Sequence, residues 1–247
     1  MKEELKKLKE KFETIKKMGW VPQRGKGFRS CGYTFETLLE KENDNFPLPD
    51  YSGIEIKVMN DNTKTNLHLF NLTPDGDYLF PIKRILDELG CPCKENHEEK
   101  KLYKTFSAKD YTKMVFGRKV IIKVNYEKSK VELIAYNYQN ENMNIGISWS
   151  FDYLKERLFL KLNYLAFVRV SSCFMYDGGY YRYHDITFYK LKDFDTFIKL
   201  IAMGIIEITF KIGTHKDGSK AGMLYDHGTD FSIKVENLEM LYEKIIV

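Results

Sequence analysis

Asp50, Glu55 and Lys57 are the residues of this chain whose types and spacing are best suited to chemistry. They lie in the segment Pro49-Asp50-Tyr51-Ser52-Gly53-Ile54-Glu55-Ile56-Lys57. Residues two apart on a strand project from the same face, so Glu55 and Lys57 would point together while the isoleucines pack behind them. Asp50 follows a proline that favours a turn, which can bring its carboxylate back toward Glu55. Two carboxylates can hold Mg²⁺ together with a substrate phosphate, and a nearby amine can orient or deprotonate a water.

A Pro-Asp followed by Glu-x-Lys is typical of many restriction and repair nucleases, but it also arises by chance. The simpler interpretation is an exposed edge strand on which Glu55 and Lys57 form a solvated pair. Three features favour the nuclease: clean alternation along the strand, the acidic Glu36 on a predicted helix upstream, and a basic chain. Glu36 is equally compatible with an exposed carboxylate near the positive end of its helix.

The composition predicts a folded protein. The chain has 247 residues, of which 43% are hydrophobic and 15% aromatic, and its net charge of +4 permits polyanion binding without establishing it. No apolar run approaches the roughly 20 residues that span a bilayer, and the N-terminus lacks the apolar region of a signal peptide. We therefore expect a cytoplasmic protein without a membrane partner. The cysteines lack zinc-site spacing and are expected to be reduced: Cys31, Cys91, Cys93 and Cys173.

The elements around these residues follow from periodicity. Apolar residues at helical spacing predict an amphipathic helix over residues 3–18, which ends at Gly19. A basic, glycine-rich loop over residues 20–29 follows, and a helix from about Thr34 carries Glu36. Four cations are expected to contact phosphates, namely Arg24, Lys26, Lys64 and Lys216.

The remaining chain alternates between helical and strand patterns, and no repeat or linker marks a domain boundary. Helices are predicted over 81–89, after an N-cap at Ser150, and over 195–203, and strands over 119–126, 130–138, 166–170 and 206–212.

A long polar segment over residues 211–231 lies between two predicted strands. A two-stranded ribbon of this kind can enter the DNA major groove, where lysine reads guanine and aspartate accepts from cytosine. The alternative is a flexible surface hairpin. His215 and His227 are also potential metal ligands, but the sequence offers no third ligand nearby. The candidate DNA-binding residues here are Lys211, His215, Lys216, Lys220, Tyr225, Asp226 and His227.

Together these motifs resemble the MvaI/BcnI family of type II restriction endonucleases, which is related to the mismatch-repair nickase MutH. The matching features are the helix that ends in Gly-Trp, the basic glycine loop, and the segments 32–42, 44–45, 49–50, 53–57, 149–152 and 226–229. The resemblance runs the length of the chain.

The resemblance implies a mixed α+β fold, with a restriction-endonuclease-like core whose central mixed sheet is flanked by helices, and a DNA-recognition lobe. The catalytic lobe would comprise residues 1–110 with parts of the C-terminal region, and the recognition lobe residues 140–235 of one nuclease chain. Asp50 and Glu55 would hold Mg²⁺, Lys57 would position the attacking water, and Glu36 would support the site.

The resemblance also implies a monomer that cuts double-stranded DNA at a short pseudopalindromic site, one strand at a time, beside a cognate DNA methyltransferase. The recognition segment departs from the family, with Lys211 and Ser232 where arginines are expected and Tyr225 in place of a histidine. Because lysine cannot replace a bidentate arginine, the resemblance does not determine the target sequence.

The alternatives to a restriction endonuclease are a MutH-like nickase or repair nuclease, a methyl-dependent enzyme, and a catalytically silent DNA-binding protein. A small-molecule hydrolase has little support because no Ser/His/Asp or Cys/His arrangement stands out.

Overall fold

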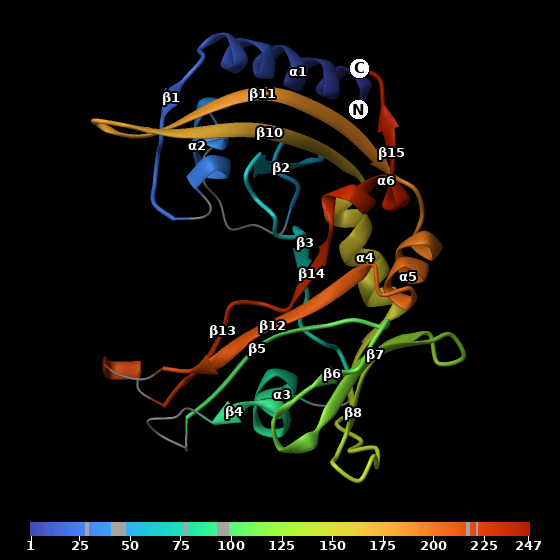
Figure 1. Cartoon of the computed structure of the whole chain (residues 1–247). Helices are drawn as coiled ribbons and strands as arrows, with labels where there is room; N and C mark the ends of the chain where they lie inside the picture. Colours follow the sequence, from blue (N-terminus) through green and yellow to red (C-terminus); the bar gives the residue numbers. More distant parts are fainter. Residues whose placement is uncertain (28–29, 41–47, 77–78, 93–98, 216–217, 221) are drawn as a thin grey trace. The chain divides into compact units, whose positions relative to one another are not determined.

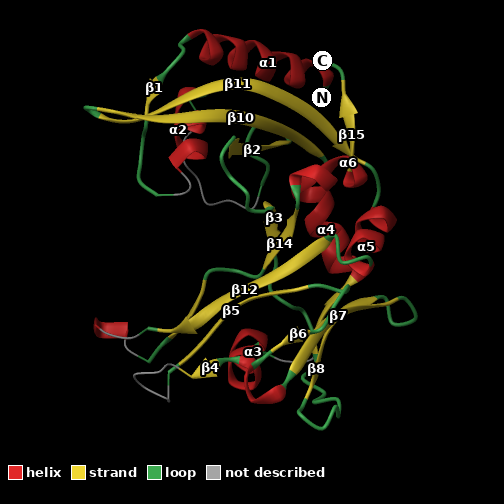
Figure 2. Cartoon of the chain, in the orientation of Figure 1, coloured by secondary structure: helices red, strands yellow, loops and turns green. Residues whose placement is uncertain are grey.

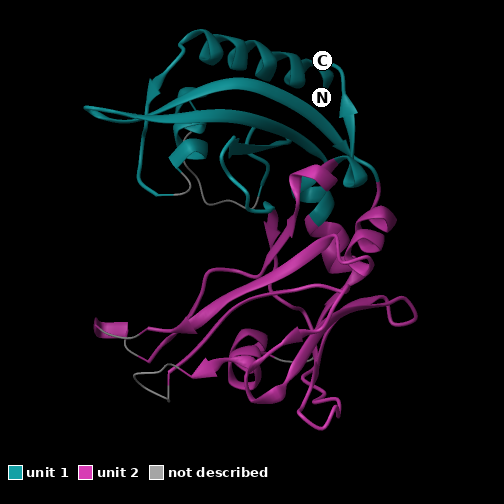
Figure 3. Cartoon of the chain, in the orientation of Figure 1, with its two compact units in different colours: residues 1–67, 158–192, 239–247 teal, residues 68–157, 193–238 magenta. Residues whose placement is uncertain are grey.

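The computed structural model describes residues 1–27, 30–40, 48–76, 79–92, 99–215, 218–220 and 222–247 (Figure 1). The chain forms two compact units, each assembled from separate segments (Figure 3). Unit 1 comprises Met1–Leu67, Leu158–Lys192 and Glu239–Val247, and unit 2 comprises His68–Arg157 and Asp193–Leu238. The catalytic and recognition lobes expected from the sequence are divisions by function, and their limits stay a prediction.

Helices and strands alternate irregularly along the chain (Figure 2). The helices are α1 (Lys2–Lys17), α2 (Ser30–Leu38), α3 (Pro81–Leu89), α4 (Phe151–Leu162), α5 (Phe194–Ala202) and α6 (Leu238–Leu241). The strands are β1 (Val21–Pro22), β2 (Ile54–Asn60), β3 (Leu67–Asn71), β4 (Cys91–Pro92), β5 (Lys100–Phe106), β6 (Thr112–Lys113), β7 (Lys119–Asn125), β8 (Lys130–Tyr136), β9 (Ile147–Ser150), β10 (Tyr164–Met175), β11 (Gly178–Leu191), β12 (Ile206–Thr214), β13 (Leu224–Asp226), β14 (Asp230–Ile233) and β15 (Tyr242–Ile245).

Unit 1 is built on a mixed sheet in the order β1-β11-β10-β2, with β15 also paired to β11. β10 runs antiparallel to β11 and parallel to β2. Helix α1 packs along β11, and α2 packs against β2 (Figure 1). The expected mixed sheet flanked by helices is therefore present.

The core of unit 1 explains why α1 forms. Leu5, Leu8, Phe12 and Ile15 recur every three or four residues and are all buried, so that one helix face lies on the sheet. After Lys17 the chain leaves the helix, and Gly19 has a φ of +69°, a conformation that glycine adopts without a steric penalty. The predicted helix over residues 3–18 is confirmed.

Unit 2 contains two sheets. One has the order β3-β14-β12-β5-β4, with β13 added to β12, and the other has the order β6-β7-β8-β9. Aromatic side chains fill the interior, where the Trp149 ring packs edge-on against Phe231 and beside Phe210. The indole N–H of Trp149 donates to the carbonyl of Leu72 at 3.0 Å, which satisfies its buried polar atom.

Most predicted elements are present, although some begin elsewhere. Helix α2 starts at Ser30 instead of Thr34, because contacts distant in sequence hold its first turn: the Ser30 hydroxyl lies 2.6 Å from that of Tyr181, and Tyr183 donates to the Cys31 carbonyl. In the described part of the chain no helix is long and apolar enough to cross a membrane. The described cysteines are free, as expected, and Cys93 lies outside the described residues.

Candidate active site

A tight turn reverses the chain between Asp50 and Glu55. Tyr51 and Ile54 each donate a backbone N–H to the other's carbonyl, at 2.9 and 2.7 Å. Ser52 and Gly53 between them have positive φ values of +43° and +85°. Two successive residues with positive φ are the signature of a type I′ turn, which matches the twist of a β-hairpin. The expected hairpin over Asp50 to Lys57 is therefore present.

The turn places Asp50 beside the strand that carries Glu55. The Asp50 carboxylate Oδ2 accepts the backbone N–H of Ile56 at 2.9 Å. Among the described strands, β2 lies at the end of its sheet and pairs with β10 alone, so this N–H is not used in strand pairing there. Asp50 thus occupies the open edge of β2, next to Glu55, as the sequence predicted.

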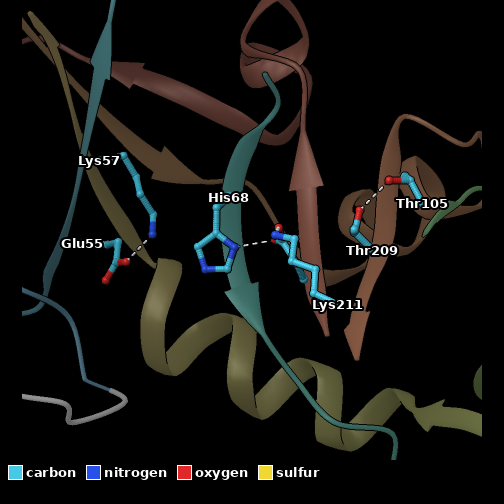
Figure 4. Close-up of polar contacts among 7 residues, drawn as sticks. Glu55, Lys57, His68, Thr105, Thr209 and Lys211 are labelled. Carbon is cyan, nitrogen blue, oxygen red and sulfur yellow. Dashed lines mark hydrogen bonds and ion pairs between the residues drawn. The ribbon is translucent and has the colours of Figure 1, made fainter. Parts of the chain in front are cut away.

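Glu55 and Lys57 form a close, buried pair. Lys57 Nζ lies 2.7 Å from Glu55 Oε1, and the Glu55 side chain is 2% exposed (Figure 4). Ile54 and Ile56 point into the core on the other face of the strand. The simpler interpretation of a solvated surface pair is therefore wrong, because the carboxylate is almost completely removed from water.

A second cation, Lys161 on α4, lies near the same carboxylate. Its Nζ is 3.3 Å from Glu55 Oε2, an ion-pair distance, although this oxygen accepts no hydrogen bond from the described residues. We take the pair as electrostatic and not as a directional hydrogen bond. Sequence reasoning missed Lys161, which by pattern is an ordinary charged residue in an amphipathic helix.

Tyr242 of β15 is another buried neighbour that the sequence did not reveal. Its hydroxyl has no hydrogen-bond partner among the described residues. Burial, followed by the negative charge of Glu55, raises the pKa of the Tyr242 phenol above its usual range. Tyr242 is therefore neutral and cannot act as a base.

Glu36 lies half-buried on α2, the helix that packs against β2. Within the described residues, no group of three or more His, Cys, Asp or Glu side chains is arranged to hold a metal ion. This applies to His215 and His227 as well. Asp50 and Glu55 remain as a two-carboxylate arrangement, which agrees with the number of protein ligands that Mg²⁺ often uses beside a substrate phosphate.

The basic glycine loop is attached at two adjacent residues, Gln23 and Arg24. Thr34 Oγ1 accepts the Arg24 backbone N–H at 2.9 Å, and the Gln23 backbone N–H donates to the Gly179 carbonyl at 2.8 Å. The side chains of Arg24 and Lys26 are exposed, as is Lys64 beyond the end of β2. All three are accessible to an anionic partner.

Most candidate base-reading residues gather on the ribbon of β12 and β13. The ring of Tyr225 lies 5.2 Å from those of His215 and His227, and its hydroxyl accepts a hydrogen bond from Tyr103 at 3.0 Å. Asp226 accepts the backbone N–H of Gly228 at 2.8 Å. Lys220 is exposed, and Lys216 lies outside the described residues.

Lys211 is not free on this ribbon, since its Nζ lies 2.9 Å from the buried carboxylate of Asp230. The other oxygen of Asp230 lies 2.5 Å from His68 Nδ1 (Figure 4). Burial alone would raise the pKa of Asp230, but His68 and Lys211 hold it below its ordinary value. The sequence did not point to His68 or Asp230, which lie far apart along the chain.

Comparisons with known proteins identify the family of the chain. The model of the MvaI/BcnI restriction endonuclease family matches residues 9–242. The chain belongs to the MvaI/BcnI restriction endonuclease family. A solved structure described as a restriction endonuclease MvaI-cognate DNA substrate complex is 30% identical, with a TM-score of 0.88 over 99% of this chain and 98% of that one. MvaI in the absence of DNA is 29% identical, with a TM-score of 0.65 over the same shares. No curated protein sequence matches the chain.

Membership of the MvaI/BcnI family makes the chain a type II restriction endonuclease, and the likeness to MvaI confirms the predicted fold. The residues that carried the resemblance lie in the matched range. Among them, Asp50, Glu55 and Lys57 are brought together by the I′ turn and the alternation of β2.

Proposed function

We propose that this MvaI/BcnI-family enzyme hydrolyses phosphodiester bonds of duplex DNA in a Mg²⁺-dependent reaction, with Asp50, Glu55 and Lys57 as its catalytic centre. The observation that carries the proposal is the buried carboxylate of Glu55, flanked by Asp50 on the open edge of β2 and by Lys57 at 2.7 Å. A buried carboxylate with a specific charged partner is a candidate functional group, because active sites concentrate such arrangements.

The donor set suits Mg²⁺. The ion prefers oxygen ligands and commonly uses one or two carboxylates together with phosphate oxygens. Glu55 Oε2 is buried and accepts no hydrogen bond from the described residues, so it has a lone pair available to a cation. When bound, Mg²⁺ would neutralise charge on the scissile phosphate and lower the pKa of a water. Asp50 and Glu55 would hold the ion.

Lys57 supplies a positive charge at a fixed position. Its Nζ lies 2.7 Å from Glu55 Oε1, and from this position the ammonium can orient a water or stabilise the charge that develops on the phosphate. Glu36 lies near the C-terminal end of the neighbouring helix α2 and would support the site from there.

We infer that DNA is bound through two sets of residues. Arg24, Lys26 and Lys64 would contact phosphates, which position the duplex without reading its sequence. The β12–β13 ribbon would read bases through Tyr225, Asp226 and His227, and its other candidates are Lys211, His215, Lys216 and Lys220. The DNA substrate named for the MvaI complex supports this assignment.

The family resemblance further favours a monomer that cuts one strand at a time, and a cognate DNA methyltransferase that protects the host's own sites. Lys211 in place of an arginine leaves the identity of the site open, because a lysine ammonium reads guanine as a point charge without the bidentate geometry of a guanidinium.

Digestion of unmethylated phage and plasmid DNA by the purified protein, with Mg²⁺ and with EDTA, tests the proposal. We expect discrete fragments only with Mg²⁺, whose sequenced ends share one short site. Nicks at a single site without double-strand breaks would instead indicate a nickase. Retained DNA binding without any cleavage would indicate a catalytically silent protein and overturn the proposal.

A further inference from the structure

Among the described residues, Lys161 is the cation paired with Glu55 that the catalytic assignment leaves unused. The two oxygens of the Glu55 carboxylate face different ammonium groups: Oε1 is 2.7 Å from Lys57 Nζ, and Oε2 is 3.3 Å from Lys161 Nζ. The Lys161 side chain is 18% exposed and that of Lys57 is 15% exposed, so both cations lie near a carboxylate that water barely reaches.

The backbone of Lys161 is firmly held. It lies in the last turn of α4, where a cation interacts favourably with the helix dipole, and Leu158 and Leu162 of the same helix are fully buried. Its ammonium, in contrast, forms an ion pair with Oε2, and this oxygen accepts no hydrogen bond from the described residues. The flexible stem of a lysine lets that ammonium leave without any movement of the helix.

With Asp50 on the same edge of β2, the two ammonium groups lie near two carboxylates, so the charges of this poorly hydrated site are close to balanced. A divalent cation that enters it adds excess positive charge unless one of the ammonium groups moves away. Since Lys57 is the closer partner, Lys161 is the group that a divalent cation would displace from Oε2.

We propose that Lys161 is a placeholder cation, which neutralises Glu55 in the metal-free enzyme and competes with the divalent metal for Oε2. This inference rests on the proposed function, because it takes Glu55 as a metal ligand. It assigns Lys161 as a positioning residue: in the absence of metal it holds the buried carboxylate in place, and it lowers the affinity of the site for metal until it is displaced.

A purely structural ion pair makes the opposite prediction. Removing Lys161 would then lower stability, although Lys57 would still compensate the charge of Glu55, and metal affinity would stay the same or fall with the loss of order. The two roles can therefore be separated by metal binding itself, measured without DNA and without turnover.

The test is titration calorimetry of the full chain with Mn²⁺, in the absence of DNA, for the wild type and for Lys161→Met, Lys161→Arg and Lys155→Met. Lys155 is exposed on the same helix and serves as the matched control. We expect Lys161→Met to bind Mn²⁺ on the order of tenfold more tightly, because a competing charge is gone. Lys161→Arg should bind more weakly, since a guanidinium holds a carboxylate through two hydrogen bonds. Lys155→Met should match the wild type.

A folded Lys161→Met protein with unchanged or weaker Mn²⁺ affinity would overturn the inference. If that variant fails to fold, unchanged or tighter binding by Lys161→Arg would overturn it equally. Glu55→Gln separates this result from failure of the proposed function. If Glu55→Gln binds Mn²⁺ as the wild type does, then Glu55 is not a ligand and both proposals fall. If it loses binding while the Lys161 variants behave as the wild type, only the placeholder role is wrong.

Discussion

At the scale of single residues, the assignment of Lys57 can be tested by its removal. Lys57→Ala should lower the cleavage rate by about 10²- to 10³-fold, the usual effect of losing one preorganised charge at a reacting centre. Binding should persist, since Lys161 still faces Glu55 and keeps its charge compensated. Single-turnover cleavage and a gel-shift assay on the same duplex measure the two effects.

Lys155→Ala, on an exposed face of α4, is the control for a general loss of positive charge and should cut at the wild-type rate. Normal cleavage by Lys57→Ala would show that the centre is assigned to the wrong residues.

The aromatic residues on the β12–β13 ribbon allow a test of base reading. Replacing His227 or Tyr225 by Ala should reduce discrimination against a single wrong base pair by about 1–3 kcal/mol, the range for one good base contact. The ratio of kcat/KM on cognate and substituted duplexes measures it. Tyr138→Ala, at a highly exposed tyrosine elsewhere in the same unit, should leave that ratio unchanged. If Tyr138→Ala lost as much discrimination as the His227 or Tyr225 variant, the loss would reflect a general effect on the unit and not base reading.

At the scale of elements, the I′ turn is what brings Asp50 to the edge of β2. Gly53 has a φ of +85°, so Gly53→Val should destabilise the protein by roughly 1–2 kcal/mol and reduce cleavage by displacing Asp50. Ser52→Asn is the control, because asparagine tolerates the positive φ of this turn position. This variant should keep the stability and the cleavage rate of the wild type. Urea unfolding and cleavage assays report them. Full activity in Gly53→Val would mean that the turn does not position the site.

His68 of β3, Lys211 of β12 and Asp230 of β14 form a cluster of charges, which we call the Asp230 cluster. This cluster should make the stability of the protein depend on pH. The pKa of Asp230 is lower in the folded protein than its ordinary value of about 3.9. Its stabilisation is therefore complete above that value and is lost as the pH falls through the folded pKa. Asp230→Asn should lower the free energy of unfolding by about 1–3 kcal/mol at pH 7. Below about pH 4, the free energy of unfolding of this variant should fall less steeply with decreasing pH than that of the wild type. Unfolding curves at several pH values check this, and an unchanged slope would contradict it.

The elements also show how far the sequence could be interpreted. The regular spacing of apolar residues predicted α1 and β2, and α3 was predicted at its observed limits, residues 81–89. The turn-forming residues between Asp50 and Glu55 predicted that the chain folds back and brings Asp50 to β2. Lys161, Tyr242 and the His68–Asp230 contact were missed, because each depends on tertiary packing between distant segments and leaves no local pattern. The start of α2 was misplaced for the same reason.

At the scale of the whole molecule, the two units are discontinuous in sequence. Unit 1 draws its sheet from residues near both ends and the middle of the chain, and no composition change marks where the chain passes from one unit to the other. Continuous residue ranges therefore cannot describe these compact units, whereas motifs confined to one strand or turn can be placed from the sequence.

The net charge of +4 is modest, so DNA affinity should depend on a few clustered cations more than on the charge of the molecule as a whole. Each phosphate contact releases counterions and adds about 0.9 to the slope of log K against log salt concentration. Arg24→Ala with Lys26→Ala should therefore make that slope shallower by nearly 2, and should weaken binding to cognate and unrelated duplexes alike. Fluorescence anisotropy over a salt series measures the affinity and its salt slope.

Lys128→Ala removes an exposed cation in the β7–β8 turn; it is the control and should keep the wild-type slope. Because the basic loop is attached at Thr34 and Gly179, a loss confined to cognate DNA would contradict a role in phosphate binding and would assign the loop to base reading.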